Sequence, residues 1–409
     1  MSRKFRHLIL SLLLSGAWAL PGFAQGNPPK SPARQAATPG KAPVLIGLDG
    51  EYTLEKSTSA HFIELGIRVA LEEINAGGGV LGGRPLKLET RDNRANPARG
   101  VANLKAFAAM KDMVAVYGGR FSPVVVELTK PAAELGIPLF AAWSSAEQII
   151  DNGQKPNWVF RLALHDKIAM PAMIERARRK GYTRLGLLLA NTSWGRSNNA
   201  SAEQHVATKS GITIVGVEWY NWGEMTLVER YDRLLKQGAQ AILLVANDKE
   251  GAIVVREVAG LPAERRVAFI SHWGITGGDF TEQAGPDNVE RVSLDVIQTF
   301  SPFRARSEKM AQLLGISQRI AGVSKPEQIH SPSGFGHAYD LTHILARAVN
   351  LAGSTDRAKV RAALEQVAGY DGLVRRYDRP FTAERHEALD GGDLFFSRYD
   401  RQGVLRPVE

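Results

Sequence analysis

Serines follow two of the predicted strands at the points where helices begin. Ser122 precedes Pro123 after the apolar run 113–119, a pattern typical of a helix N-cap followed by proline. The first backbone N–H groups of a helix attract anions, so a cap at this position could also hold a carboxylate. Ser144 and Glu147 have the spacing of a capping box, which would leave the hydroxyl of Ser145 free for a ligand.

Three of the seven tryptophans also follow predicted strands, and this placement favours a ligand with a flat or apolar body. They are Trp143, Trp194 and Trp273. Asp248 follows another strand, and Tyr52 lies in the loop after the first one. Packing between two domains is the alternative explanation for aromatic residues at these positions.

Nothing in the sequence predicts an enzyme or a cofactor. The chain has no cysteine, and its nine histidines are scattered without metal-binding spacing. Residues 77–82 match the dinucleotide fingerprint GxGxxG, but they follow a predicted helix and precede a strand, which is the reverse of the required order. We therefore interpret 77–82 as a helix stop and turn, and we expect no metal and no nucleotide.

Alternation of short apolar runs with helical stretches predicts an α/β fold. The first series has strands at 44–50, 85–93, 113–119 and 137–143, with helices at 57–76, 97–110 and 123–135. The second has strands at 158–164, 184–191, 213–220, 241–248, 267–273 and 291–300, with helices at 167–180, 194–209, 226–238, 248–259 and 276–284. Helices at 303–315, 334–352 and 356–368 follow, then a short strand pair around 372–377 and 394–400. Such repetition predicts two doubly wound parallel-sheet lobes, with the ligand crevice at the carboxyl ends of the strands.

The N-terminal residues predict export. Residues 1–24 combine a basic start, an apolar run too short to span a membrane and a small-residue cleavage site, as a signal peptide does. Residues 25–43 are rich in proline, glycine and alanine and are interpreted as a flexible linker. Because no cysteine is available for a lipid anchor, we expect the mature protein to be free in the periplasm.

The net charge of +9 does not indicate a nucleic-acid partner. Six basic residues and no acid lie in residues 1–43, so the folded body carries only +3. The one basic cluster, at 176–180, is interpreted as a solvated helix end.

From about residue 43 onward the chain resembles the periplasmic solute-binding proteins of ABC importers, type I, in the leucine/isoleucine/valine-binding group. The matching stretches are 46–92, 114–125, 137–146, 190–197 and 335–348, and the most specific is EINAGG at 73–78 followed by LGGRPL. The resemblance implies two lobes joined by a three-stranded hinge. Lobe one would comprise 44–161 plus about 300–370, and lobe two 162–299 plus about 371–409. It also implies a monomer that captures a small solute and delivers it to a membrane permease.

Carried over by position, the resemblance implies that Ser122 and Ser145 hold a ligand carboxylate and that the carbonyl of Trp143 accepts from an amino group. Trp194 stands where the family has a lobe-two aromatic. Trp273 stands near the position where amino-acid binders have an acid.

Without that acid a buried ammonium would lack a partner, unless Asp248 supplies the charge. The predicted ligand is therefore a small carboxylate with an apolar or aromatic body, or a related amide, with branched-chain and other amino acids left open. A sensory receptor that signals to a membrane protein is the alternative function.

Overall fold

The computed structural model describes residues 40–208 and 211–408. The predicted signal peptide and all but the last four residues of the predicted linker lie outside this range. Within the described residues, no helix combines the length and apolar character that crossing a membrane requires.

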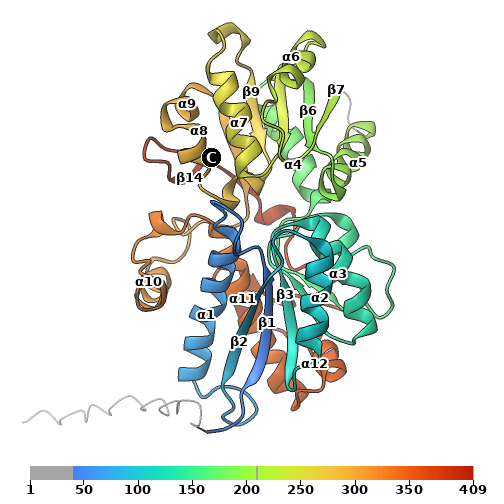
Figure 1. The fold of residues 1–409 in the computed structure, drawn as a ribbon, viewed down its shortest axis with the longest axis vertical. Helices are drawn as coiled ribbons and strands as arrows, with labels where there is room; N and C mark the ends of the chain where they lie inside the picture. Colours follow the sequence, from blue (N-terminus) through green and yellow to red (C-terminus); the bar gives the residue numbers. More distant parts are fainter. Residues whose placement is uncertain (1–39, 209–210, 409) are drawn as a thin grey trace, which may run out of the picture. The chain divides into compact units, whose positions relative to one another are not determined.

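The first sheet has five parallel strands in the order β2-β1-β3-β4-β5. These are β1 (Val44–Gly50), β2 (Leu86–Asp92), β3 (Met113–Gly118), β4 (Leu139–Ala141) and β5 (Val159–Arg161). Helices α1 (Ser59–Ala76) and α11 (Pro332–Ala352) cover one face, whereas α2 (Pro97–Ala108) and α3 (Ser122–Glu134) cover the other (Figure 1). Strand order reverses between β1 and β3, so a ligand crevice is expected at their carboxyl ends.

Two further helices complete this lobe, α10 (Ser307–Ala321) against α1 and α12 (Arg357–Leu364) against α11. Helix α1 ends at Ala76 with Gly77 as its C-cap, and an isolated bridge between Val80 and Arg84 closes the next turn. The interpretation of 77–82 as a helix stop and turn is confirmed.

The second sheet has seven strands in the order β14-β13-β10-β9-β8-β6-β7, of which β13 and β14 are antiparallel to their neighbours. The strands are β6 (Arg184–Ala190), β7 (Thr213–Tyr220), β8 (Ala241–Val245), β9 (Ala268–Ser271), β10 (Leu294–Gln298), β13 (Phe395–Tyr399) and β14 (Leu405–Val408). Every residue of β8 is buried, which explains its unbroken apolar run. Here the order reverses between β6 and β8.

The helices of the second lobe fill the connections between its strands. They are α4 (Asp166–Arg179), α5 (Ser193–Ala207), α6 (Val228–Lys236), α7 (Asp248–Ala259), α8 (Phe280–Ala284) and α9 (Pro286–Arg291). With the first sheet, they confirm the predicted α/β fold of two doubly wound lobes.

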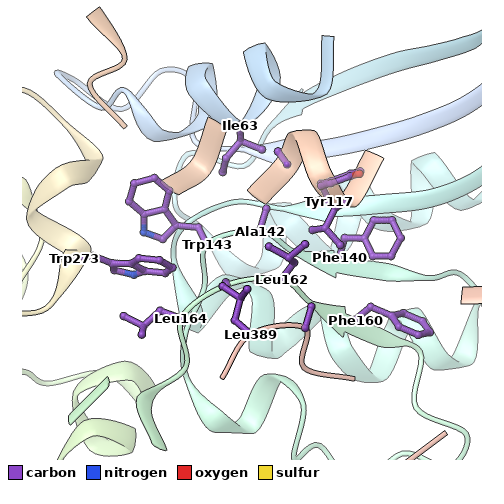
Figure 2. Close-up of a cluster of buried hydrophobic side chains, with 14 of the residues drawn as sticks. Ile63, Tyr117, Phe140, Ala142, Trp143, Phe160, Leu162, Leu164, Trp273 and Leu389 are labelled. Carbon is purple, nitrogen blue, oxygen red and sulfur yellow. The ribbon is translucent and has the colours of Figure 1, made fainter. Parts of the chain in front are cut away.

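The chain passes between the two sheets three times, after β5, after β10 and before β13, which is the predicted three-stranded hinge. The first crossing is itself buried. Leu162 and Leu164 pack in one apolar cluster with Trp143 and Trp273 (Figure 2). Core packing is therefore continuous through this crossing.

In the C-terminal segment, β13 and β14 join the second sheet as expected, whereas the hairpin before them differs from the expectation. Residues 371–409 were predicted to join lobe two, with 372–377 pairing near 394–400. Instead β11 (Tyr370–Asp371) pairs with β12 (Arg376–Tyr377), and β13 pairs with β14. Tyr370 and Tyr377 both donate hydrogen bonds of 2.9 Å to the buried Asp340 of α11, which holds this hairpin on the first lobe. The two contacts span 30 and 37 positions in sequence and left no local signal.

Candidate ligand-binding site

A pocket lies at the carboxyl ends of the strands of both sheets, next to the two points where strand order reverses. Its lining residues come from the segments that follow β3, β4, β6, β7, β8 and β9: Arg120, Phe121, Ser122, Trp143, Ser145, Trp194, Trp222, Asn247, Trp273 and Gly274. Five of the seven predicted site residues are among them. Tyr52 and Asp248 are not.

Aromatic rings form the apolar part of this pocket. The rings of Trp143 and Trp273 lie 5.6 Å apart between centroids and tilt by 46° (Figure 2). The ring of Trp194 meets that of His272 edge to face at 5.0 Å. At Gly274 a Cβ atom would lie 2.5 Å from the ring of Trp194, so only glycine lets the backbone approach so closely. The free volume that remains is only about 10 Å³.

The serines bind the backbone in a way that the sequence did not indicate. Ser122 is the first residue of α3 and does not cap it, because its hydroxyl accepts from the N–H groups of Ser145 (3.2 Å) and Ala146 (3.3 Å). The predicted capping box is also wrong, since the Ser144 hydroxyl donates to the carbonyl of Gly119 at 2.7 Å.

The hydroxyl of Ser145 forms no hydrogen bond to any other described residue, although this residue is only 2% exposed. This is the free hydroxyl that the sequence predicted, although it arises from different contacts. Ser122 fixes the loop of Ser145, and the hydroxyl of Ser145 remains without a partner within the described residues.

The unpartnered polar groups of the pocket include three fully buried nitrogens that can only donate. They are Nε1 of Trp194, Nε1 of Trp222 and Nε of Arg120, and none has a hydrogen-bond partner within the described residues, although Nε of Arg120 lies 4.0 Å from Oε1 of Glu51. Buried donors are satisfied in nearly all native structures, and a donor without a partner points to an acceptor supplied from outside. An oxygen-rich ligand would satisfy these nitrogens.

Arg120 also joins the two lobes. Its Nη1 donates to Oδ1 of Asp248 at 2.6 Å, and both side chains are almost completely buried. The other carboxylate oxygen of Asp248 accepts from Gln283 at 3.2 Å. Asp248 therefore already has a cationic partner, and it borders a neighbouring groove rather than this pocket.

Tyr52 lies away from the pocket. Its ring packs edge to face on His61 of α1 at 5.4 Å, and its N–H donates to Asp92 at 3.0 Å. Burial raises the pKa of its phenol above the ordinary value. The Asp92 contact turns the loop after β1 so that the ring of Tyr52 packs on the first lobe.

His337 packs against one of the pocket tryptophans. The centroid of its ring lies 5.5 Å from that of Trp273. Its Nδ1 lies 2.9 Å from the carbonyl oxygen of Ala142, which can only accept, so Nδ1 carries the proton. Nε2 then accepts from the hydroxyl of Thr299 at 2.8 Å. Burial lowers the pKa of His337 to about 4 and keeps the ring neutral at physiological pH.

One group of side chains has the composition of a metal site. Ligand atoms of Glu147, His165 and Glu387 lie within 4.8 Å of one another. However, Arg161 Nη2 lies 2.5 Å from Glu387, and Lys167 Nζ lies 3.5 Å from Glu147. Burial would raise the pKa of Glu147, but its contacts with His165 and Arg161 lower it to about 2. Protein cations already balance these carboxylates.

Sequence reasoning missed five lining residues as site residues: Arg120, Phe121, Trp222, Asn247 and Gly274. Trp222 follows β7 by two positions, so the rule that selected the other tryptophans would have found it. Arg120 lies beside Ser122, and only its charge could have drawn attention to it.

Comparison with curated proteins finds distant relatives. The chain is 25% identical over 333 residues to a Leu/Ile/Val-binding protein homolog of Brucella suis, covering 80% of this chain and 83% of that protein. It is 21% identical over 376 residues to glutamate receptor 3.1 of rice (Oryza sativa), covering 88% of this chain but spanning only 38% of the receptor.

Solved structures share the fold at low identity. A type 1 periplasmic binding protein from Bordetella pertussis superposes with a TM-score of 0.79 at 23% identity, covering 90% of this chain and all of that one. A Streptococcus pneumoniae protein in complex with isoleucine gives 0.74 at 17%, covering 90% and 99%. A Rhodopseudomonas palustris protein in complex with 4-hydroxybenzoate gives 0.73 at 15%, covering 90% and 95%.

A family model described as periplasmic binding protein matches residues 41–404, which is nearly all of the described chain. The expected binding role, in place of an enzymatic one, is confirmed by this match and by the binding proteins among its relatives. The protein therefore belongs to the periplasmic binding protein family.

Proposed function

We propose that this protein is the extracytoplasmic substrate-binding component of an ABC importer. It captures a small carboxylate with an apolar or aromatic body between its lobes and delivers that solute to a membrane permease. We further propose that it is exported by cleavage after residue 24 and acts as a periplasmic monomer.

The observation that supports a carboxylate ligand is that the unpartnered nitrogens of the pocket are all hydrogen-bond donors. Trp194, Trp222 and Arg120 each present a buried N–H without an acceptor. A carboxylate supplies acceptor lone pairs for such groups, whereas an ammonium supplies only more donors. Charge-assisted hydrogen bonds of this kind are about twice as strong as neutral ones.

The charges near the pocket also disfavour an α-amino acid. Asp248 and Glu51 are the buried acids that could have paired with an ammonium, and Arg120 already lies 2.6 Å from the first and 4.0 Å from the second. A leucine ammonium would have to replace the guanidinium as the partner of one of them. The ring pair of Trp143 and Trp273 instead offers a surface for a flat apolar body.

Ligand capture would begin on the first lobe. Ser145 offers a free hydroxyl beside the ring of Trp143, and Ser122 holds the loop that carries it. Trp194 and Trp273 would then close on the ligand from the second lobe. Contacts made only in the closed form give the ligand its preference for that form.

Structures with this fold in complex with 4-hydroxybenzoate and with isoleucine show that both ligand classes fit similar lobes. A melting-temperature screen of the mature protein against benzoate, 4-hydroxybenzoate, leucine, isoleucine and valine separates them. We expect the aromatic acids to raise the melting temperature and the amino acids to leave it unchanged. Stabilisation by the amino acids alone would overturn the proposal.

Sensing is the second candidate, because the rice glutamate receptor matches over 88% of this chain. Deletion of the gene followed by measurement of aromatic-acid uptake separates the two roles. Loss of uptake supports transport, whereas intact uptake with a lost transcriptional or motile response supports sensing.

A further inference from the structure

A second and larger cavity opens beside the tryptophan-lined pocket. It has a volume of about 640 Å³, within the range of roughly 300–1,000 Å³ that drug-sized ligands occupy. It shares Arg120, Phe121, Trp222 and Asn247 with the pocket, so the two spaces are adjacent and these four residues border both. We call this second space the side groove, and its interpretation rests on the proposed function.

Apolar side chains line both edges of the side groove. Leu54 comes from the loop after β1, Met225 from the turn after β7, and Ile253 from α7. Leu54 is 36% exposed and Met225 is 75% exposed. Among the described residues only one other large apolar side chain, Leu351, is similarly exposed. Two of these three side chains therefore flank one groove.

Two aromatic rings separate the groove from the pocket. Phe121 and Trp222 meet edge to face at 5.1 Å, and the guanidinium of Arg120 lies over the ring of Phe121 at 4.7 Å from its centroid. Both rings line both spaces. At this centroid distance the two rings are in contact, so an apolar chain that extends from the pocket into the groove has to displace one of them.

Charges around the groove are of both signs and largely balanced. Lys56 pairs with Glu282 at 3.0 Å, and Asp248 pairs with Arg120. Glu250 accepts from the N–H of Gly223 at 3.1 Å, and its burial raises its pKa. Lys249, Arg256 and Glu55 complete the lining charges. No excess of one sign is present to bind a second ionised group.

We propose that the side groove binds the uncharged tail of the transported acid. The ligand class is then an aromatic monocarboxylate with an alkyl or aryl extension opposite the carboxylate. The carboxylate lies at Ser145 and the donor nitrogens, the ring lies among the tryptophans, and the tail reaches Leu54, Met225 and Ile253.

Isothermal titration calorimetry with benzoate and 4-butylbenzoate tests this proposal, because the two acids differ only in the tail. Each fully buried methylene contributes roughly a fourfold gain in affinity. We therefore expect 4-butylbenzoate to bind the mature wild-type protein at least about tenfold more tightly than benzoate.

Groove variants locate the tail. Met225→Asp and Leu54→Asp should each weaken 4-butylbenzoate about tenfold and leave benzoate within about twofold, because an aspartate there opposes burial of an alkyl chain. Leu351→Asp is the matched control, since it changes an apolar residue on α11 whose exposure, 56%, lies between those of Leu54 and Met225, and it should alter neither constant.

Three outcomes would overturn the side-groove assignment while leaving the proposed function in place. The protein could bind the two acids with equal affinity, it could fail to bind 4-butylbenzoate, or Met225→Asp could weaken the binding of both acids equally. Binding of leucine without either acid would overturn the proposed function itself.

Discussion

Nη1 of Arg120 donates to Oδ1 of Asp248 over 2.6 Å and so connects the segment after β3 to the first residue of α7. The two side chains are 4% and 5% exposed. A buried charge pair contributes little over apolar packing, but losing one partner leaves the other charge unsatisfied in the interior. Replacing either Arg120 or Asp248 alone is therefore expected to destabilise the fold.

Replacement of Asp248 by asparagine should destabilise the protein strongly. We expect a loss of about 3 kcal/mol in the free energy of unfolding, measured by urea denaturation, because Arg120 would remain buried with only the more distant Glu51 carboxylate, 4.0 Å from its Nε, as a counter-charge. Arg306→Gln is the control, since its pair with Asp371 is 63% and 57% exposed and should cost less than about 1 kcal/mol. A loss as small for Asp248→Asn as for Arg306→Gln would contradict the importance of the buried pair.

The two pocket serines should separate stability from binding. Ser122→Ala removes the acceptor of two backbone N–H groups and should cost about 1–3 kcal/mol of stability. Ser145→Ala removes a hydroxyl without an intramolecular partner, so stability should change by less than about 0.5 kcal/mol.

Affinity for 4-hydroxybenzoate should respond to the Ser145 change. Calorimetric titration should show a loss of about tenfold in Ser145→Ala, the value of roughly one hydrogen bond. A Ser145→Ala protein that is destabilised but binds normally would assign that hydroxyl to the fold.

Acid should destabilise the protein partly through His337. Its pKa is about 4 in the fold against 6.5 for the ordinary side chain, so the unfolded chain takes up a proton that the folded chain refuses. The stability contribution is therefore complete above pH 6.5 and is lost as the pH falls towards 4, by about 3 kcal/mol in total.

The measurement is the free energy of unfolding at pH 7.5 and 4.5 for wild type and His337→Asn. Asp49 acts in the opposite direction over part of this range, because burial raises its pKa to about 6, so the difference between the two proteins is the informative quantity. Equal pH dependence in both would show that His337 is not the titrating group.

Sequence reasoning predicted the two lobes and five pocket residues because both follow from short-range patterns. Strand and helix periods are local. Ligands of α/β sheets bind at the carboxyl ends of the strands, and selecting the residues that follow each predicted strand identified Trp143, Trp194 and Trp273 without any knowledge of contacts. The same rule placed Tyr52 wrongly, since a hydrogen bond to Asp92 forty residues away orients that loop.

The remaining site features depend on partners distant in sequence. Ser-Pro before a helix predicts a cap, yet Ser122 accepts from N–H groups 23 and 24 positions further along the chain. Arg120 and Asp248 are separated by 128 positions, and no local pattern links them. Asp340 likewise holds a hairpin that begins thirty residues later.

The central claim is that buried donors of the tryptophan-lined pocket bind a carboxylate, and Trp194→Phe tests it most directly. This change keeps an aromatic ring and removes the unpartnered Nε1–H. Trp158→Phe, outside the pocket, is the control. The account predicts that the dissociation constant of 4-hydroxybenzoate rises about 10- to 100-fold in Trp194→Phe, as for loss of a hydrogen bond to a charged group, and stays within about twofold in Trp158→Phe. A dissociation constant in Trp194→Phe equal to that of wild type would contradict it.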